Sequence, residues 1–183
     1  MFLARRAFLR GSGAALLTSA VPGLAMATAL PRPATRHLAF ENIHTGEKLA
    51  VDYCIDGKLQ PDALAAVNKV LRDYRNGEMH AMDTRLLDLL HDIHGRLETN
   101  AAFQVISGYR SPATNNMLHE RSSGVASKSL HMQGMAIDIR LPDRALDKLH
   151  QAALDLGEGG VGMYPTSNFV HVDVGRVRRW NGV

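Results

Sequence analysis

Residues 129–138 read SLHMQGMAID and combine a turn-forming glycine with the start of a short apolar strand. Seven residues separate His131 from Asp138, so a continuous strand would place the two side chains on opposite faces of a sheet. Gly134 lies between them and allows the chain to turn. We therefore expect a strand over 136–141, with a loop histidine and a strand aspartate that converge on one point.

A second short strand, expected over 168–174, carries another set of polar side chains. His171 and Asp173 are two residues apart on it and so face the same side. A hydrolytic zinc site takes three protein ligands of the histidine and carboxylate type and keeps a fourth position for water. His131, Asp138 and His171 supply those ligand types, and their nitrogen content favours zinc over other divalent ions. Asp173 could act as the base for the water or as the acceptor of an imidazole N–H.

A second pair of histidines is the other place where a metal could bind. His91 and His94 are three residues apart on an expected helix, but no third ligand lies near them in the sequence. Because their neighbours are apolar, we expect a partly buried or surface pair and no metal site there.

Hydrophobic periodicity predicts the remaining elements. The expected strands cover 38–43, 48–55, 103–107, 136–141, 161–164 and 168–174, and the last two of these close the chain. The expected helices cover 61–74, 83–97, 114–121 and 143–156, with Asp83 as a cap. Helices come first and strands cluster late, so we expect an α+β fold, in which a small, mostly antiparallel sheet carries the zinc site and the helices pack on one side.

The composition excludes several classes of protein. The 183 residues are 45% hydrophobic and 21% charged, which is typical of a globular domain and not of a disordered or fibrous chain. The net charge of +3 comes from Arg5, Arg6 and Arg10, because residues 1–29 hold no acid and the rest of the chain is balanced. Nucleic-acid binding thereby loses its main support, and we expect no such partner.

Residues 1–29 have the three regions of a secretory signal: a charged start, a mildly apolar stretch over 11–24 and small residues at the end. Adjacent arginines before Ala-Phe-Leu predict the twin-arginine export route. The apolar stretch is too short for a stable membrane span, although an uncleaved anchor is the alternative. We expect a linker over 30–37 and a single domain over 38–183 that works in the periplasm or outside the cell. The single Cys54 lies in a strand-like pattern and is expected to be buried.

The pattern Ser-x-His-x-x-Gly-x-Ala-x-Asp at 129–138, followed by a distant histidine, resembles the zinc D-Ala-D-Ala carboxypeptidases and murein endopeptidases, which share their core with the hedgehog signalling domain. The chain is still more similar to the MepK-type periplasmic murein endopeptidases, over nearly its whole length. The matching segments are NIHTGE at 42–47, ISGYRS at 106–111, TNN at 114–116, GGVG at 159–162, YP at 164–165, SNFVH at 167–171 and RW at 179–180, together with the paired arginines near the start.

This resemblance implies specific chemistry. Enzymes of this type bind one Zn²⁺ through residues that match His131, Asp138 and His171, and they hydrolyse peptide bonds in the stem peptides of peptidoglycan. MepK-type members cut the cross-link between two meso-diaminopimelate residues, and some also cut the link from D-Ala to diaminopimelate. The arginine that matches Arg110 holds substrate or stabilises the oxyanion.

Three further residues are candidates for contact with a stem peptide. Ser129 has no base in a motif with it, so we expect it to bond substrate or a ligand and not to act as a nucleophile. Asn115 stands near the start of a helix, where it could cap the helix or bind substrate. Tyr164 is expected to line the cleft.

The chain departs from several relatives at the base. Those relatives place a histidine two residues, or an acid three residues, before the last zinc histidine, whereas this chain has Phe169 and Asn168, neither of which takes a proton. Asp173 is the nearest ionisable candidate. Two other functions therefore stay open: a D,D- or L,D-carboxypeptidase that trims stem peptides, and a non-catalytic module that binds peptidoglycan or zinc.

Overall fold

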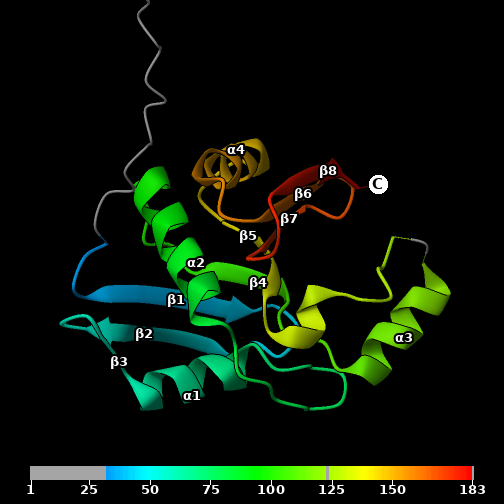
Figure 1. Cartoon of the computed structure of the whole chain (residues 1–183), viewed down its shortest axis with the longest axis horizontal. Helices are drawn as coiled ribbons and strands as arrows, with labels where there is room; N and C mark the ends of the chain where they lie inside the picture. Colours follow the sequence, from blue (N-terminus) through cyan, green and yellow to red (C-terminus); the bar gives the residue numbers. More distant parts are fainter. Residues whose placement is uncertain (1–31, 123, 183) are drawn as a thin grey trace, which may run out of the picture. The chain divides into compact units, whose positions relative to one another are not determined.

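A mixed sheet of eight strands forms the framework of the protein in the computed structural model, which describes residues 32–122 and 124–182 (Figure 1). The expected export signal over 1–29 lies outside the described residues. The strands lie side by side in the order β3-β2-β1-β4-β5-β7-β6-β8. In chain order they cover Arg36–Asn42 (β1), Lys48–Ile55 (β2), Lys58–Leu59 (β3), Phe103–Ser107 (β4), Ala136–Arg140 (β5), Gly160–Tyr164 (β6), Phe169–Asp173 (β7) and Arg178–Asn181 (β8).

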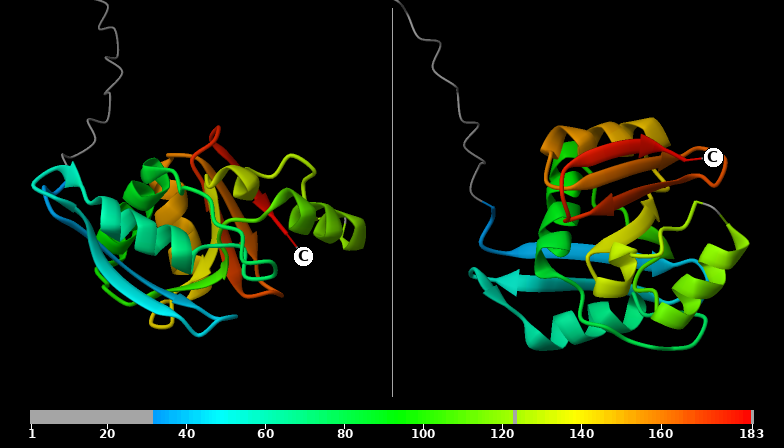
Figure 2. Two further views of the ribbon diagram at one scale, coloured as in Figure 1. Left: turned by 90° about the horizontal axis from the view of Figure 1, so that it is seen from below. Right: turned by 45° about the vertical axis from the view of Figure 1, so that its right-hand side comes forward.

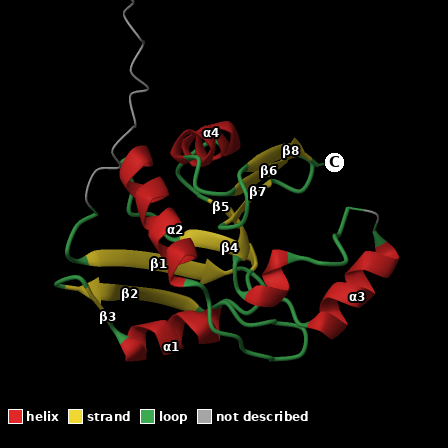
Figure 3. Ribbon diagram, viewed as in Figure 1, coloured by secondary structure: helices red, strands yellow, loops and turns green. Residues whose placement is uncertain are grey.

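The helices are inserted between the strands along the chain (Figure 3). They cover Pro61–Val70 (α1), Thr84–Leu97 (α2), Pro112–Arg121 (α3) and Leu146–Leu156 (α4), with a short 3₁₀ helix at Leu130–Gln133 (η1). All neighbouring strands pair antiparallel except β1 with β4 and β6 with β8, which are parallel. The expected α+β class with a mostly antiparallel sheet is confirmed, although the sheet is larger than expected.

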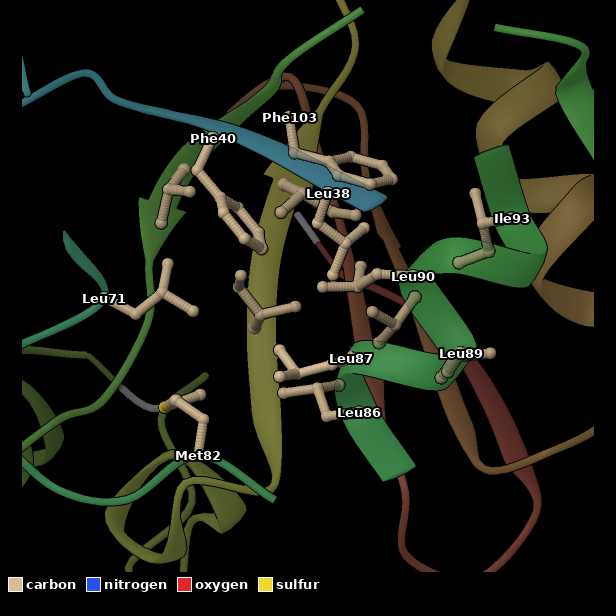
Figure 4. Close-up of a cluster of buried hydrophobic side chains, with 14 of the residues drawn as sticks. Leu38, Phe40, Leu71, Met82, Leu86, Leu87, Leu89, Leu90, Ile93 and Phe103 are labelled. Carbon is tan, nitrogen blue, oxygen red and sulfur yellow. The ribbon is translucent and has the colours of Figure 1, made fainter. Parts of the chain in front are cut away.

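The apolar face of the sheet is covered by α1, α2 and α4, which contact β1, β2, β6 and β7. The left view in Figure 2 shows α1 and α2 on the inner side of the curved strands. Helix α2 directs Leu86, Leu87, Leu90 and Ile93 into this core, where they are fully buried against the strands (Figure 4). Burial of each such side chain contributes about 1.5–3 kcal/mol to the stability of the fold.

Helix α2 begins where the sequence predicts. The Asp83 carboxylate accepts a hydrogen bond from the backbone N–H of Arg85 and so satisfies one of the free N–H groups at the helix start. Cys54 is fully buried, as expected.

Two helices are shorter than the periodicity predicts. Helix α1 ends at Val70 and not at residue 74, because the carbonyl of Val70 accepts from the Asn42 side chain and that of Leu71 accepts from the Tyr109 N–H. Helix α4 begins at Leu146, three residues later than expected, because its N-cap Ala145 is extended; Asp143 lies before the helix and accepts from the Thr99 hydroxyl. At the end of α1, tertiary hydrogen bonds therefore replace helical ones.

The expectation that the strand over 168–174 is the last one of the chain is wrong. Strand β8 follows β7, crosses to the other side of β6 and pairs with it in parallel. Its arginine-rich sequence does not show the alternation of apolar and polar residues from which a strand is predicted. Among the helices of the described chain, none combines the length and apolarity that a membrane crossing needs.

Candidate metal centre

The turn between His131 and Asp138 forms as the sequence predicts. His131 lies in η1, whose backbone is held at its start by the Ser129 hydroxyl. Gly134 ends this helix in the left-handed region at a φ of 66°, and a Cβ there would lie 2.3 Å from the carbonyl oxygen of Ala81. Only glycine fits such a position without strain, so Gly134 is what returns the chain into β5.

The three candidate ligands meet on the face of the sheet opposite α1, α2 and α4. Asp138 on β5 is the register partner of His171 on β7, and η1 brings His131 over both. One ligand atom from each residue lies within 4.8 Å of the others. Asp138 Oδ1 is 2.8 Å from His171 Nδ1 and 3.3 Å from His131 Nε2, and those two nitrogens are 3.3 Å apart.

The remaining ring nitrogens fix the tautomers. His131 Nδ1 lies 2.8 Å from the carbonyl oxygen of Gly108, which only accepts, so the proton is on Nδ1 and the Nε2 lone pair is free. His171 Nε2 donates to Asp173 Oδ2 at 3.0 Å, and His171 Nδ1 faces Asp138 Oδ1, which also only accepts, so Nδ1 can offer its lone pair to a cation once it has lost its proton. Three electron-pair donors therefore converge on one point. Such a donor set fits a divalent cation, with the other nitrogen of each ring oriented by a protein acceptor.

The electrostatics of the metal-free site agree with this fit. Burial would lower the pKa of His171, but hydrogen bonds to Asp138 and Asp173 outweigh it and raise that pKa to about 9. Burial would raise the pKa of Asp138, yet the charges and hydrogen bonds of the two histidines hold it well below its usual range. Burial lowers the pKa of His131. In the metal-free site, the proton on His171 Nδ1 thus occupies the position that a bound cation would take.

Asp173 has no exposed surface, and its carboxylate is fully engaged by donors. Besides His171, it accepts from Arg178 Nη2 at 2.7 Å, from Arg178 Nη1 at 3.0 Å and from the backbone N–H groups of Gly160 and Gly175. Burial would raise the pKa of Asp173, but the hydrogen bonds from His171 and Arg178 hold it well below its usual range. Asp173 therefore contacts the His171 nitrogen that faces away from Asp138.

An open cleft of about 730 Å³ lies over the three candidate ligands. One wall is the segment 124–130, which includes Lys128 and Ser129. The other wall is aromatic and consists of Tyr164, Phe169 and Trp180, which we call the aromatic wall. The Tyr164 and Phe169 rings stack at 4.4 Å, and Trp180 Nε1 donates to the Tyr164 hydroxyl at 2.9 Å.

Arg110 is buried and lines the cleft beside the candidate ligands. A bulge in β4 between Val105 and Ser107 brings Ser107 into register with Asp138. Arg110 Nη2 then lies 3.2 Å from Ser107 Oγ and 3.4 Å from Asp138 Oδ2. Burial lowers the pKa of this guanidinium, with Asp138 opposing the effect. A buried cation beside the ligands is suited to an anionic group on the substrate.

Asn115 is placed differently from expectation. It is fully buried, does not line the cleft, and donates through Nδ2 to the carbonyl oxygens of Ala126 and Ser127. It supports the 124–130 wall from beneath and does not face a substrate. The sequence could not indicate this, because the contact depends on a loop that returns over α3.

Arg178, Phe169 and Trp180 also line the cleft, which hydrophobic periodicity and the ligand motif do not predict. Two signals were available: the alternation of Arg178 and Trp180 about Arg179, and the alternation of glycines at the start of β6. Each pattern is typical of a strand whose two faces have different surroundings.

Two histidines and an aspartate whose lone pairs can converge beneath a cleft form a candidate site of the kind found in metal-dependent hydrolases. Comparison with protein families agrees with this class. The family described as "Peptidoglycan L,D-endopeptidase MepK" matches residues 31–180, so the chain belongs to that family of peptidoglycan endopeptidases.

Curated relatives support the same assignment. The chain is 44% identical over 177 residues to the peptidoglycan L,D-endopeptidase MepK of Escherichia coli K12, and the match covers 96% of each protein. The protein of the same name from Shigella flexneri matches equally well. A probable peptidoglycan L,D-endopeptidase MepK from Haemophilus influenzae is 41% identical over 181 residues, which cover 98% of this chain and 96% of the relative.

Proposed function

We propose that this protein is a zinc-dependent murein endopeptidase of the periplasm that hydrolyses the 3-3 cross-link between two meso-diaminopimelate residues. That bond joins the carboxyl group of an L centre to the amine of a D centre, which agrees with the L,D-endopeptidase names of the relatives. The observation that carries the proposal is the convergence of three lone pairs at the cleft floor.

The proposed ion is one Zn²⁺ per chain, held by His131 Nε2, Asp138 Oδ1 and His171 Nδ1. Two imidazole nitrogens and one carboxylate are ligands that zinc prefers in hydrolytic sites. Within the described chain, this is the single group of three suitable side chains that lie close enough for one ion. When bound, zinc lowers the pKa of a coordinated water and polarises the scissile carbonyl.

The residues of the cleft then bind and orient the stem peptides. The planar guanidinium of Arg110 pairs with the negative charge that develops on the scissile carbonyl oxygen or with a stem-peptide carboxylate. The Tyr164 hydroxyl accepts from the Trp180 indole, which can only donate, so its own proton is available to the substrate. Ser129, at the opposite wall, also holds the start of η1 and contacts substrate from there.

Asp173 has the role of orienting His171 and not that of the base. Its oxygens accept from His171, Arg178 and two backbone N–H groups, so no lone pair remains directed toward a water in the cleft. Among the described residues that line the cleft, Asp138 is the only carboxylate, and it is a proposed ligand. Positions 168 and 169 supply no base, and no other carboxylate among the described residues of the cleft wall can take that role.

The proposal is tested with three defined muropeptides: a 3-3 dimer, a dimer linked through D-Ala and diaminopimelate, and an uncross-linked tetrapeptide. Zinc-loaded protein is incubated with each, beside a chelated sample and the His131→Ala variant, and the products are identified by mass spectrometry. Chelator-sensitive conversion of the 3-3 dimer to monomers is the expected result.

The other products identify the alternatives. Loss of only the terminal D-Ala from the tetrapeptide would make the protein a carboxypeptidase. Intact muropeptides beside protein with stoichiometric zinc would favour a binding module.

A further inference from the structure

Strand β6 has glycines at positions 160 and 162, on the face that carries the candidate ligands. Gly162 is the register partner of His171 on one side and of Trp180 on the other, and Gly160 pairs with Arg178. A Cβ on Gly160 would lie 2.4 Å from both Arg178 Nη1 and Asp173 Oδ2, and a Cβ on Gly162 would lie 2.4 Å from the Trp180 ring. The two missing side chains leave the space through which residues of the edge strand β8 cross β6 and reach β7.

Arg178 uses this space to hold Asp173. Its Nη1 and Nη2 atoms bond the two carboxylate oxygens separately, at 3.0 and 2.7 Å. The guanidinium is itself held by the Arg176 carbonyl at 3.1 Å and lies 5.0 Å from the centroid of the Trp180 ring. Two parallel N–H···O bonds fix the plane of a carboxylate, which a single point charge cannot do.

The plane of Asp173 matters because one of the oxygens that Arg178 binds also accepts from His171. Asp173 Oδ2 receives Nη2 of Arg178 and Nε2 of His171. A line of contacts therefore runs from β8, across Gly160, to the ring whose Nδ1 faces Asp138. Trp180 covers the same ring at a centroid distance of 5.2 Å and limits its rotation.

We propose that Arg178 is a positioning residue of the metal site: by holding both oxygens of Asp173 it keeps His171 Nε2 bonded and His171 Nδ1 directed toward the other two ligands. This inference rests on the proposed metal site but not on which peptide bond is cut. The edge strand β8 thus supplies a residue that orients a ligand of the metal site. The competing explanation is that the ion pair only fastens β8 to the sheet.

The test measures zinc affinity of the purified protein by competition with a chromophoric chelator, so it needs no substrate. Arg178→Gln should weaken zinc binding by roughly 10- to 100-fold, the usual effect of removing a group that orients a metal ligand. Arg178→Lys keeps the charge but loses the fork, and should recover only part of the affinity. The matched control is Arg179→Gln, the exposed neighbour that β8 directs to the other face, which should bind zinc as the wild type does.

A double-mutant cycle separates positioning from fastening. If Arg178 acts through Asp173, Arg178→Gln should change zinc affinity by less than about 3-fold in an Asp173→Asn background, because the contact with His171 is already altered. The visible spectrum of cobalt-loaded Arg178→Gln should also shift, since it reports ligand geometry.

Three results are decisive against the proposal. Folded Arg178→Gln could bind zinc with wild-type affinity and differ only in a lower melting temperature of the metal-free protein. The ion pair would then only attach β8 to the sheet. Additive losses in the cycle would also overturn it. A wild-type protein that binds no zinc would overturn both the inference and the proposed function, whereas zinc binding without cleavage would overturn the function alone.

Discussion

Strands β5 and β7 have two faces with opposite chemistry. Ile137, Ile139 and Val172 point into the core beneath the helices, while Asp138 and His171, their neighbours in sequence, form the candidate metal centre. Burial is enough to hold the first face, because apolar contacts have no required direction. The second face depends on register, since each of its donors must meet one particular acceptor.

Two histidines show the difference in their pKa values. On the apolar side, His94 of α2 stacks on Phe103 with a centroid distance of 4.0 Å, and burial lowers its pKa to about 4. On the polar side, His171 is also buried, yet Asp138 and Asp173 raise its pKa to about 9. For these two histidines, the hydrogen-bond partners and not the burial decide which one holds a proton near neutral pH.

The largest effect is expected from a ligand on the polar face. His131→Ala removes one of three donors, so stoichiometric zinc binding and all turnover should be lost. The metal-free variant should remain folded, because the helices pack on the other face. Equilibrium dialysis with zinc and a thermal melt measure the two properties. Zinc retained at wild-type affinity would place the metal elsewhere.

Arg110→Gln should have the next largest effect. Loss of a charged donor to the oxyanion lowers kcat by about 10²- to 10³-fold. Zinc affinity should change much less, since the Arg110 guanidinium meets Asp138 at Oδ2, whereas the histidines face Oδ1. If zinc affinity falls in parallel with kcat, Arg110 acts by orienting Asp138 and not on the substrate.

The sequence predicts one face better than the other. Period-2 and period-3.6 patterns locate β2, β4 and α2 almost to the residue, because their apolar side chains must be buried. The ligand set is also predictable, since metal chemistry limits the residue types. Asn115, Arg178 and the C-terminal end of α1 are not, because their partners come from distant segments that no local pattern reports.

Ile139→Ala tests the apolar face alone. Deleting this fully buried side chain should lower the free energy of unfolding by about 2–5 kcal/mol, through lost burial and the cavity that remains. Zinc affinity of the folded protein should stay within about 3-fold of wild type, although Asp138 is the adjacent residue. Urea denaturation of the metal-free protein gives the stability. A large loss of zinc affinity would mean that the two faces are coupled through the strand.

The smallest effect is a pH dependence on the apolar side. The folded-state pKa of His94, about 4, lies below its ordinary value of 6.5, so the unfolded chain binds the proton more readily. Stability from this histidine is present above pH 6.5 and is lost as the pH falls toward 4, by about 2 kcal/mol between pH 7 and 5. His94→Gln cannot take up that proton, so its urea-unfolding free energy should fall less over the same interval. If the unfolding free energies of the two proteins fall equally between pH 7 and 5, His94 has a partner for its proton in the folded protein. The surroundings of His94 and His171 would then differ less than their pKa values indicate.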